Sequence, residues 1–402
     1  MRPRTRGLTF GAVLAAAVFA SFALASTGIV RGSGRQIVDT GRYQDYADAM
    51  RADLVPYRDF DLEYPPGALP IFLLPALVTE DEDAYFWGFA ALMSLFGAAG
   101  VLLTAASLSS LGRSPRARRS ILAVVAVSPI AFGGMLLTRF DLVPAALVAA
   151  ATLLLLTSRP RAAGIALGIG AAVKWYPLVL FPLLAIWVWR RHGRRTSVVA
   201  CASALAVLAL AYLPLALLAP TDVGESVWRQ VSRPLQIESL GAGVLVVFHH
   251  LAGLDLAVET SYGSQNITGT AATVVAVALS VAGVAALAWV WVARRPANPE
   301  LLVRLAAATL FALVAFGKVL SPQFLVWLLF PLALVGGRRG VAAGTCFAVA
   351  AIVTAVWFPW RYFDLPRELD PLVGSLVVLR GLALIAAFVV LVLPARQARS
   401  VS

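Results

Sequence analysis

Long apolar runs separated by short polar or basic segments extend along almost the whole chain. A helix needs about 20 apolar residues to cross a bilayer, and fewer if it is short or re-entrant. The pattern therefore predicts an all-α polytopic membrane protein, with one integral membrane domain over residues 1–402 and a bundle of about ten full spans. The predicted spans are residues 8–29, 84–110, 120–137, 142–157, 197–219, 270–293, 301–317, 324–336, 341–357 and 372–394.

Two further apolar stretches are too short for ordinary spans. Residues 162–189 have basic clusters at both ends, so this segment must cross twice or not at all. Two half-helices of about 12–15 residues, each reaching about 20 Å, fit a hairpin broken at Lys174-Trp175-Tyr176-Pro177 near the outer side. Residues 66–78 have acidic residues on both sides and are predicted to be re-entrant or interfacial on the outside.

Arginine clusters set the predicted orientation, because cytoplasmic loops carry an excess of Lys and Arg. Ten crossings with both termini in the cytoplasm put every cluster on that side: residues 2–6, 113–119, 159–161, 190–195, 294–295, 338–339 and 396–399. The same topology leaves only Glu300 of the 21 acidic residues inside. We therefore expect a multi-pass protein of the plasma membrane with its active site facing outside. An alternative reads the N-terminus, with Ala23-Leu24-Ala25, as a cleaved secretory signal.

Composition excludes several classes of protein. Hydrophobic residues make up 60% of the 402 positions and charged residues only 13%, whereas a soluble domain is about half apolar and a quarter charged. A soluble enzyme and a disordered chain are therefore excluded. The net charge of +12 does not indicate nucleic-acid binding, because the basic residues lie between spans. Cys201 and Cys346 lie in different apolar runs and form no disulfide framework.

Two long outer loops, residues 30–83 and 220–269, are where an extracytoplasmic site can be built. Asp39 lies about nine residues beyond the first span, where partial desolvation can raise a carboxyl pKa and suit it to general-base work. Asp45, Asp61 and Glu63 are the alternatives in the same loop. The Asp59-Phe60-Asp61 spacing is common by chance, so no metal site and no cofactor are predicted.

Cationic side chains near the predicted outer interface form a second group. A charge at membrane depth costs about 2.5–3.5 kcal/mol on insertion scales, so it is usually paired or functional. Lys174 and Lys318 are the only lysines in the chain, and both lie at helix breaks. We expect a lipid phosphate to be bound by Arg139, Lys174, Arg233 and Lys318; snorkelling toward headgroups is the alternative. Predicted substrate contacts are Tyr43, Tyr64, Gln236, Glu238 and Gln323.

An ordered set of short motifs resembles the GT87-type polytopic glycosyltransferases, GT-C-fold enzymes of actinobacteria that include mannosyltransferases. The motifs span residues 38–335: Val38-Asp39 with Tyr43, Pro56-Tyr57, Glu63-Tyr64-Pro65-Pro66, Arg139-Phe140-Asp141-Leu142-Val143-Pro144, Ala172-Val173-Lys174-Trp175-Tyr176-Pro177, and Ser321-Pro322-Gln323 with Trp327.

The resemblance implies inverting transfer of a hexose, with mannose favoured, from a polyprenyl-phosphate sugar to a lipid or cell-envelope glycan acceptor. It implies that the acid just after the first span is the general base, and Asp39 stands at that position. The chain departs from some members at Gln323-Phe324, where they carry histidines. No histidine of this chain is therefore assigned to catalysis.

Two other functional classes are compatible with part of the pattern. A polytopic lipid or small-molecule transporter or flippase would share the hydropathy, the broken helices and the intramembrane cations. Many secondary transporters contain two related halves, and the sequence shows no such halves. A structural assembly protein would not need the acidic residues that gather in the outer loops.

Overall fold

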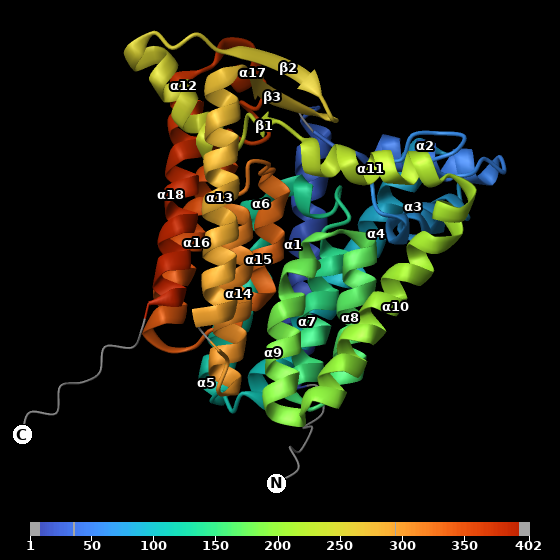
Figure 1. The fold of residues 1–402 in the computed structure, drawn as a ribbon, viewed down its shortest axis with the longest axis vertical. Coiled ribbons are helices and arrows are strands. Elements are labelled where there is room, and N and C mark those ends of the chain that lie inside the picture. Colours follow the sequence, from blue (N-terminus) through green and yellow to red (C-terminus); the bar gives the residue numbers. More distant parts are fainter. Residues whose placement is uncertain (1–8, 35–36, 294, 394–402) are drawn as a thin grey trace, which may run out of the picture.

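The computed structural model describes residues 9–34, 37–293 and 295–393 as a bundle of helices (Figure 1). Within these ranges, seven helical segments are long and apolar enough to cross a membrane. They are α1 (Phe10–Gly32), α4 (Glu82–Ser110), the segment Pro115–Leu136, α10 (Arg194–Leu218), α13 (Thr270–Ala293), α16 (Gly337–Trp357) and α18 (Pro371–Val392). The prediction of an all-α polytopic membrane protein is confirmed.

The segment Pro115–Leu136 is not one continuous helix. It consists of α5 (Pro115–Val127), α6 (Pro129–Phe132) and η2 (Gly133–Leu136). The remaining three predicted spans are helices of less than spanning length. They are α7 (Leu142–Leu156), α14 (Pro299–Ala315), and η4 (Pro322–Leu325) followed by α15 (Val326–Ala333).

Three of the helices are too short to reach across a full bilayer. With 15 residues, α7 is about 22 Å long, which is less than a hydrocarbon core of about 30 Å. Polar turns follow or precede these helices, at Arg139–Asp141 and at Ser321–Gln323. A membrane protein with such helices can therefore recess a polar site below the surface of the bilayer.

The predicted broken hairpin is present. Helix α8 (Pro160–Val173) ends where Lys174 takes an extended backbone conformation, and η3 (Tyr176–Leu180) leads into α9 (Phe181–His192). Pro177 lies at the start of η3, where its missing N–H leaves no hydrogen bond unmade. The two half-helices contain 14 and 12 residues, within the predicted range of about 12–15.

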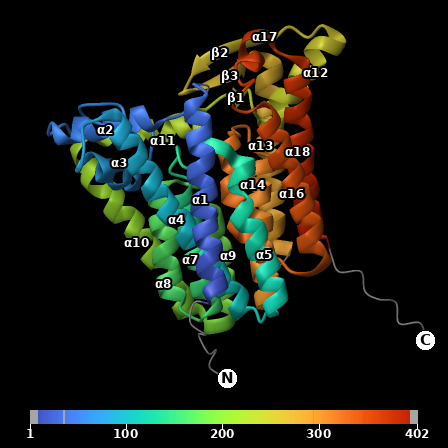
Figure 2. The same ribbon diagram turned by 180° about the vertical axis from the view of Figure 1, so that it is seen from behind.

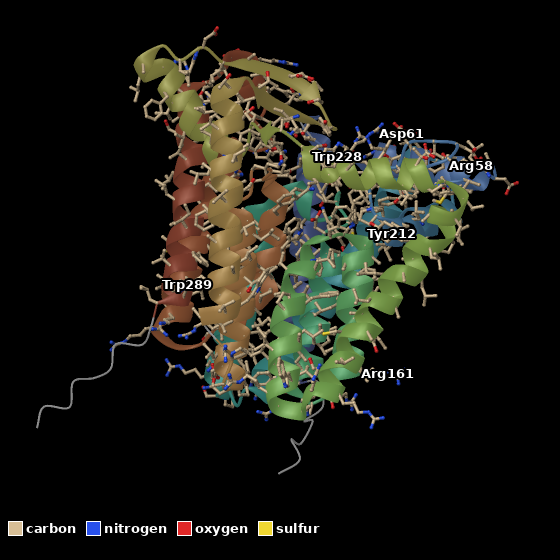
Figure 3. All side chains as sticks on the ribbon, viewed as in Figure 1. Arg58, Asp61, Arg161, Tyr212, Trp228 and Trp289 are labelled. Atoms are coloured by element: carbon tan, nitrogen blue, oxygen red, sulfur yellow. The ribbon has the colours of Figure 1, made fainter. Side chains whose placement is uncertain are left out.

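The elements between the spans gather at one end of the bundle, called here the loop end (Figures 1 and 2). These elements are α2 (Thr40–Arg51), η1 (Pro66–Ala68), α3 (Leu69–Ala76), α11 (Pro220–Ser232), α12 (Leu240–Ala252), α17 (Asp364–Glu368), β1 (Leu235–Gln236), β2 (Ala257–Ser261) and β3 (Ser264–Thr268). Figure 3 shows Asp61 at the loop end and Arg161 at the opposite end. The predicted arginine clusters at residues 2–6 and 396–399, together with Arg294, lie outside the described residues.

The second long loop is more ordered than its polar sequence indicates. Residues 220–269 contain two helices and a three-stranded antiparallel sheet in the order β1-β3-β2. Leu235 pairs with Ile267 and Gln236 with Asn266 across β1 and β3. Because Leu235, Ile267 and Asn266 are buried, the sheet fixes the position of the chain that follows β1.

Aromatic packing fixes the first loop against the bundle. The ring of Tyr43 on α2 stacks on Phe72 of α3 at 4.4 Å and meets Phe140 edge-on at 5.7 Å. Gly67 allows a close approach to the hairpin, because a Cβ there would lie 2.5 Å from the carbonyl oxygen of Ala172. These contacts bring the start of α2 and the end of α8 to the same place.

Candidate active site

A cavity of about 350 Å³ opens among the elements of the loop end. It joins parts of the chain that are far apart in sequence, from the first loop to the turn before α17. Its charged and amide-bearing lining residues are Asp39, Arg42, Glu63, Arg139, Lys174, Gln230, Arg233, Gln236, Glu238 and Gln323. Its aromatic lining residues are Tyr64, Trp175, Tyr176, Phe324, Trp327, Phe358 and Tyr362.

Asp39 is the N-cap residue of α2. Its carboxylate forms an ion pair with Arg139, and that arginine also donates to the backbone carbonyl of Ile37 at 3.3 Å. The phenols of Tyr64 and Tyr43 donate to the same carboxylate oxygen, Oδ2, at 3.4 and 3.5 Å. Burial raises the pKa of Tyr64, so its phenol stays a neutral donor. The ion pair and the two phenols thus hold the Asp39 side chain in a fixed orientation at the cavity wall.

Lys174 reaches the cavity from the break between α8 and α9. Its ammonium group lies 2.7 Å from the carboxylate of Asp141, whose side chain is 2% exposed. The indole N–H of Trp327 donates to the same oxygen, Oδ1, and within the described part of the chain Oδ2 has no hydrogen-bond partner. Asp141 therefore compensates the charge of Lys174 from beneath the cavity.

Stacked aromatic rings surround the lysine. The ring of Trp327 lies between Tyr176, at a centroid distance of 4.2 Å, and Phe324, at 4.0 Å. The ammonium group of Lys174 lies 4.7 Å from the centre of the Phe140 ring. Such faces attract a cation, so the lysine side chain is held in place from several sides.

Arg233 differs from the other cations of the cavity. Arg42 pairs with Glu63 at 2.7 Å, Arg139 with Asp39, and Lys174 with Asp141. Within the described ranges, Arg233 has no such ion pair; one of its terminal nitrogens donates to the hydroxyl of Ser264 at 3.0 Å. Its buried Nε has no hydrogen-bond partner there either. Arg233 is consequently the cavity cation with the greatest capacity to bind an added anion.

Glu238 contributes a second buried carboxylate. It lies between β1 and α12, is 2% exposed, and accepts a hydrogen bond from the side-chain amide of Gln236. Burial raises the pKa of Glu238 to about 7, and the nearby guanidinium groups of Arg380, Arg139 and Arg233 oppose that rise. Its protonation therefore changes near neutral pH.

Most of the expected site residues meet at this cavity, and four do not line it. Lys318 donates to the carbonyl of Val231 at 2.9 Å; it is half-buried and does not line the cavity. Asp45 is exposed on α2, and Asp61 is exposed and pairs with Arg229 at 3.0 Å. Tyr43 is buried behind the wall, where its phenol donates to Asp39 and its ring meets Tyr64 edge-on at 5.7 Å. Of the three alternative bases, Glu63 is the one that lines the cavity.

Several residues of the site were not selected from the sequence. Asp141 could have been found as the one acid in the short loop between the predicted spans 120–137 and 142–157. Arg380 could have been found as an arginine within an apolar run, a position that usually has a partner. Arg42, Gln230 and Tyr362 gave no sequence signal, since only the fold brings them to the cavity.

The arrangement places a carboxylate, hydrogen-bonding amides and a guanidinium group that has no ion pair within the described ranges in one recessed space. A carboxylate can accept a proton from a hydroxyl group, and a guanidinium group binds a phosphate through charge-assisted hydrogen bonds. Among the described residues, no three His, Cys, Asp or Glu side chains are grouped so that they could hold a metal ion.

Comparison with protein families finds a match over most of the chain. The family model of glycosyltransferase family 87 matches residues 62–322. The matched region begins after Asp39 and ends at the start of η4, so it contains Glu63, Arg139, Lys174, Arg233 and Glu238. No curated protein matches the chain.

Proposed function

The chain belongs to glycosyltransferase family 87, and from this premise we propose the reaction that this membrane glycosyltransferase performs. It transfers a hexose, with mannose favoured, from a polyprenyl-phosphate sugar to a lipid or a cell-envelope glycan. The transfer takes place at the loop end, which faces the outside of the plasma membrane. The family match disfavours the transporter and assembly-protein alternatives.

One observation carries the proposal: Asp39 and Arg233 line the same recessed cavity with Lys174. A lipid-linked donor brings its phosphate to the membrane surface. Because helices α7, α14 and α15 are short, the polar residues at their ends lie at the depth of that phosphate. Among the described residues that line the cavity, Arg233 is the one guanidinium group without an ion pair, and it can bind one phosphate in a bidentate manner. Arg139 and Lys174 add positive charge around it.

In the proposed step, Asp39 is the general base. The acceptor hydroxyl oxygen attacks the anomeric carbon from the face opposite the phosphate, and its proton passes to the Asp39 carboxylate. The bond between the anomeric carbon and the phosphate oxygen breaks, and its electron pair leaves with the phosphate. Because a phosphate is already a good leaving group, no general acid is needed. The configuration at the anomeric carbon is inverted.

Other cavity residues would bind the two substrates. Tyr64, Gln236, Glu238 and Gln323 offer hydrogen bonds to sugar hydroxyl groups, and Tyr43 supports the base from behind the wall. The exposed residues Asp45 and Asp61 remain alternatives for the base but lie away from the cavity. Lys318 contributes at most a long-range charge, since its ammonium group is held by Val231.

Purified protein incubated with a panel of radiolabelled polyprenyl-phosphate sugars and a membrane-lipid extract tests this function. We expect transfer of one hexose, from a polyprenyl-phosphate donor, to a product that chromatography separates from the donor. Nucleotide sugars are the matched negative control. Transfer from a nucleotide sugar alone would refute the donor class, and donor movement across vesicles without any product would restore the transporter alternative.

A further inference from the structure

Arg380 is a fully buried arginine in the last spanning helix. It lies within α18, an apolar helix of 22 residues, and has 0% exposure. A charged group inside a membrane helix is costly, so it is nearly always paired or functional. Arg380 lies outside residues 62–322, the part of the chain that matches the family, and the proposed reaction does not use it.

The contacts of Arg380 lead to the wall of the cavity. One terminal nitrogen, Nη2, donates to the backbone carbonyl of Glu238. Its guanidinium carbon lies 5.6 Å from the centre of the Trp357 ring. Within the described ranges, Nε and Nη1 have no hydrogen-bond partner. The charge of Arg380 is therefore directed at the Glu238 turn, residues 236–239, rather than at another salt bridge.

Close packing of α18 against α12 brings the two groups together. Gly381 follows Arg380, and a Cβ at that glycine would lie 2.6 Å from Cδ1 and 2.8 Å from Cβ of Leu240. Leu240 begins α12, and the Ser239 hydroxyl caps that helix by accepting from the N–H of Ala242 at 3.2 Å. The end of the Glu238 turn is thus fixed directly on the face of α18 that carries Arg380.

Several groups besides Arg380 act on the Glu238 carboxyl. Gln236 of β1 donates to it, and Arg139 and Arg233 lie near enough to lower its pKa. Burial acts in the opposite direction and is the largest effect, while Arg380 is the strongest of the opposing charges. The phenol of Tyr362, which lines the cavity, also interacts with the Glu238 carboxyl. Removal of Arg380 therefore favours the protonated form of Glu238.

We propose that Arg380 is a positioning residue of the transferase site: it holds the Glu238 turn in place and favours the anionic form of Glu238 in the cavity wall. As an anion, Glu238 accepts hydrogen bonds from the hydroxyl groups of the bound sugar; a protonated carboxyl accepts them more weakly. The proposal rests on the proposed glycosyltransferase function and adds the last spanning helix to its site.

The test compares Arg380→Met, Arg380→Lys and Glu238→Gln in the purified full-length protein. We expect Arg380→Met to lower kcat/KM about ten- to a hundredfold at pH 7, as for a lost charge-assisted hydrogen bond. We also expect the acid limb of its rate profile to move to higher pH by about 1–3 units, because an opposite charge is lost. Arg380→Lys keeps the charge, so the limb stays near its wild-type position while part of the rate is lost.

Thermal unfolding separates this role from a purely structural one. Arg380→Met removes the strongest of the charges that offset burial of the Glu238 carboxylate, whereas the double variant Arg380→Met/Glu238→Gln also removes that carboxylate. We therefore expect the double variant to unfold at a higher temperature than Arg380→Met alone. Arg338→Met is the matched control, because it removes an exposed arginine at the opposite end of the bundle.

Two results would overturn the proposal. The first is an acid limb that stays at the wild-type pH in Arg380→Met, or that persists in Glu238→Gln. The second is a thermal effect of Arg380→Met that Glu238→Gln does not relieve. If the wild-type protein transfers no sugar from any donor, the proposed function fails, and the thermal comparison still decides whether Arg380 and Glu238 are coupled.

Discussion

Arg233→Gln is the substitution that isolates binding of the donor phosphate. Arg139 and Lys174 each have a partly or fully buried acid as partner, so removing either one also leaves a carboxylate unpaired. Such a loss costs about 3–5 kcal/mol in a buried pair and can prevent folding. Within the described residues, the hydrogen bond of the Arg233 side chain goes to the neutral Ser264 hydroxyl, so its removal should cost little stability.

The size of the effect follows from the contact that is lost. A hydrogen bond to a charged group contributes about 1.5–3 kcal/mol. Loss of one such contact to the donor phosphate therefore weakens donor binding about ten- to a hundredfold. Arg233→Lys should recover part of the affinity, because an ammonium group keeps the charge but lacks the planar fork.

The assay measures binding of a polyprenyl-phosphate sugar and its transfer at several donor concentrations. Arg229→Gln is the matched control, since Arg229 and its partner Asp61 are 54% and 84% exposed and such surface pairs contribute about 0–1 kcal/mol. We expect the control to keep wild-type donor affinity. Wild-type affinity in Arg233→Gln, or a larger loss in Lys318→Ala, would refute the assignment of the phosphate to Arg233.

Three further predictions concern the support of the site, its pH dependence and its orientation. Asp141→Asn should lower both the thermal midpoint and donor use, because Lys174 then lies buried without its counter-charge; unchanged unfolding would contradict the role of that pair. The raised pKa of Glu238, about 7, means that the folded state binds the proton more tightly than the unfolded chain does. The free energy of unfolding should accordingly fall as pH rises from about 4.5 to about 7. Glu238→Gln should remove this dependence. A wild-type thermal midpoint that does not change over that pH interval would contradict the prediction. In intact cells, an impermeant thiol reagent should label Asp61→Cys but not Arg116→Cys. Labelling of Arg116→Cys would contradict the predicted orientation in the membrane.

Hydropathy predicted the spans well, because each span must be apolar enough to leave water regardless of its neighbours. The break at Lys174 was also predictable, since a lysine and a proline interrupt an apolar run between two basic clusters. The sequence did not show why α7 and α15 are short. The reason depends on the fold, because only the fold brings the ends of these helices together at one cavity.

The candidate site was predictable where a charged residue lies next to a span, as with Asp39, Arg139 and Lys174. The pairing of those charges was not predictable. The sequence offered four cations for a phosphate. In the part of the chain that the structure describes, Arg233 has no ion pair, whereas the ammonium group of Lys318 donates to the carbonyl of Val231. The small sheet of residues 235–268 was not predicted from the sequence, because its strands are short and only partly apolar.

Asp39→Asn tests the central claim most directly, because asparagine keeps the shape of the side chain but cannot take the acceptor proton. Asp45→Asn is the matched control, since Asp45 is exposed on the same helix α2. The account predicts donor binding near the wild-type level and transfer at least about a hundredfold slower in Asp39→Asn, as for loss of a positioned base. It predicts a wild-type rate in Asp45→Asn. Transfer at the wild-type rate by Asp39→Asn would contradict the account, and an inactive Glu63→Gln variant would then identify the base as Glu63.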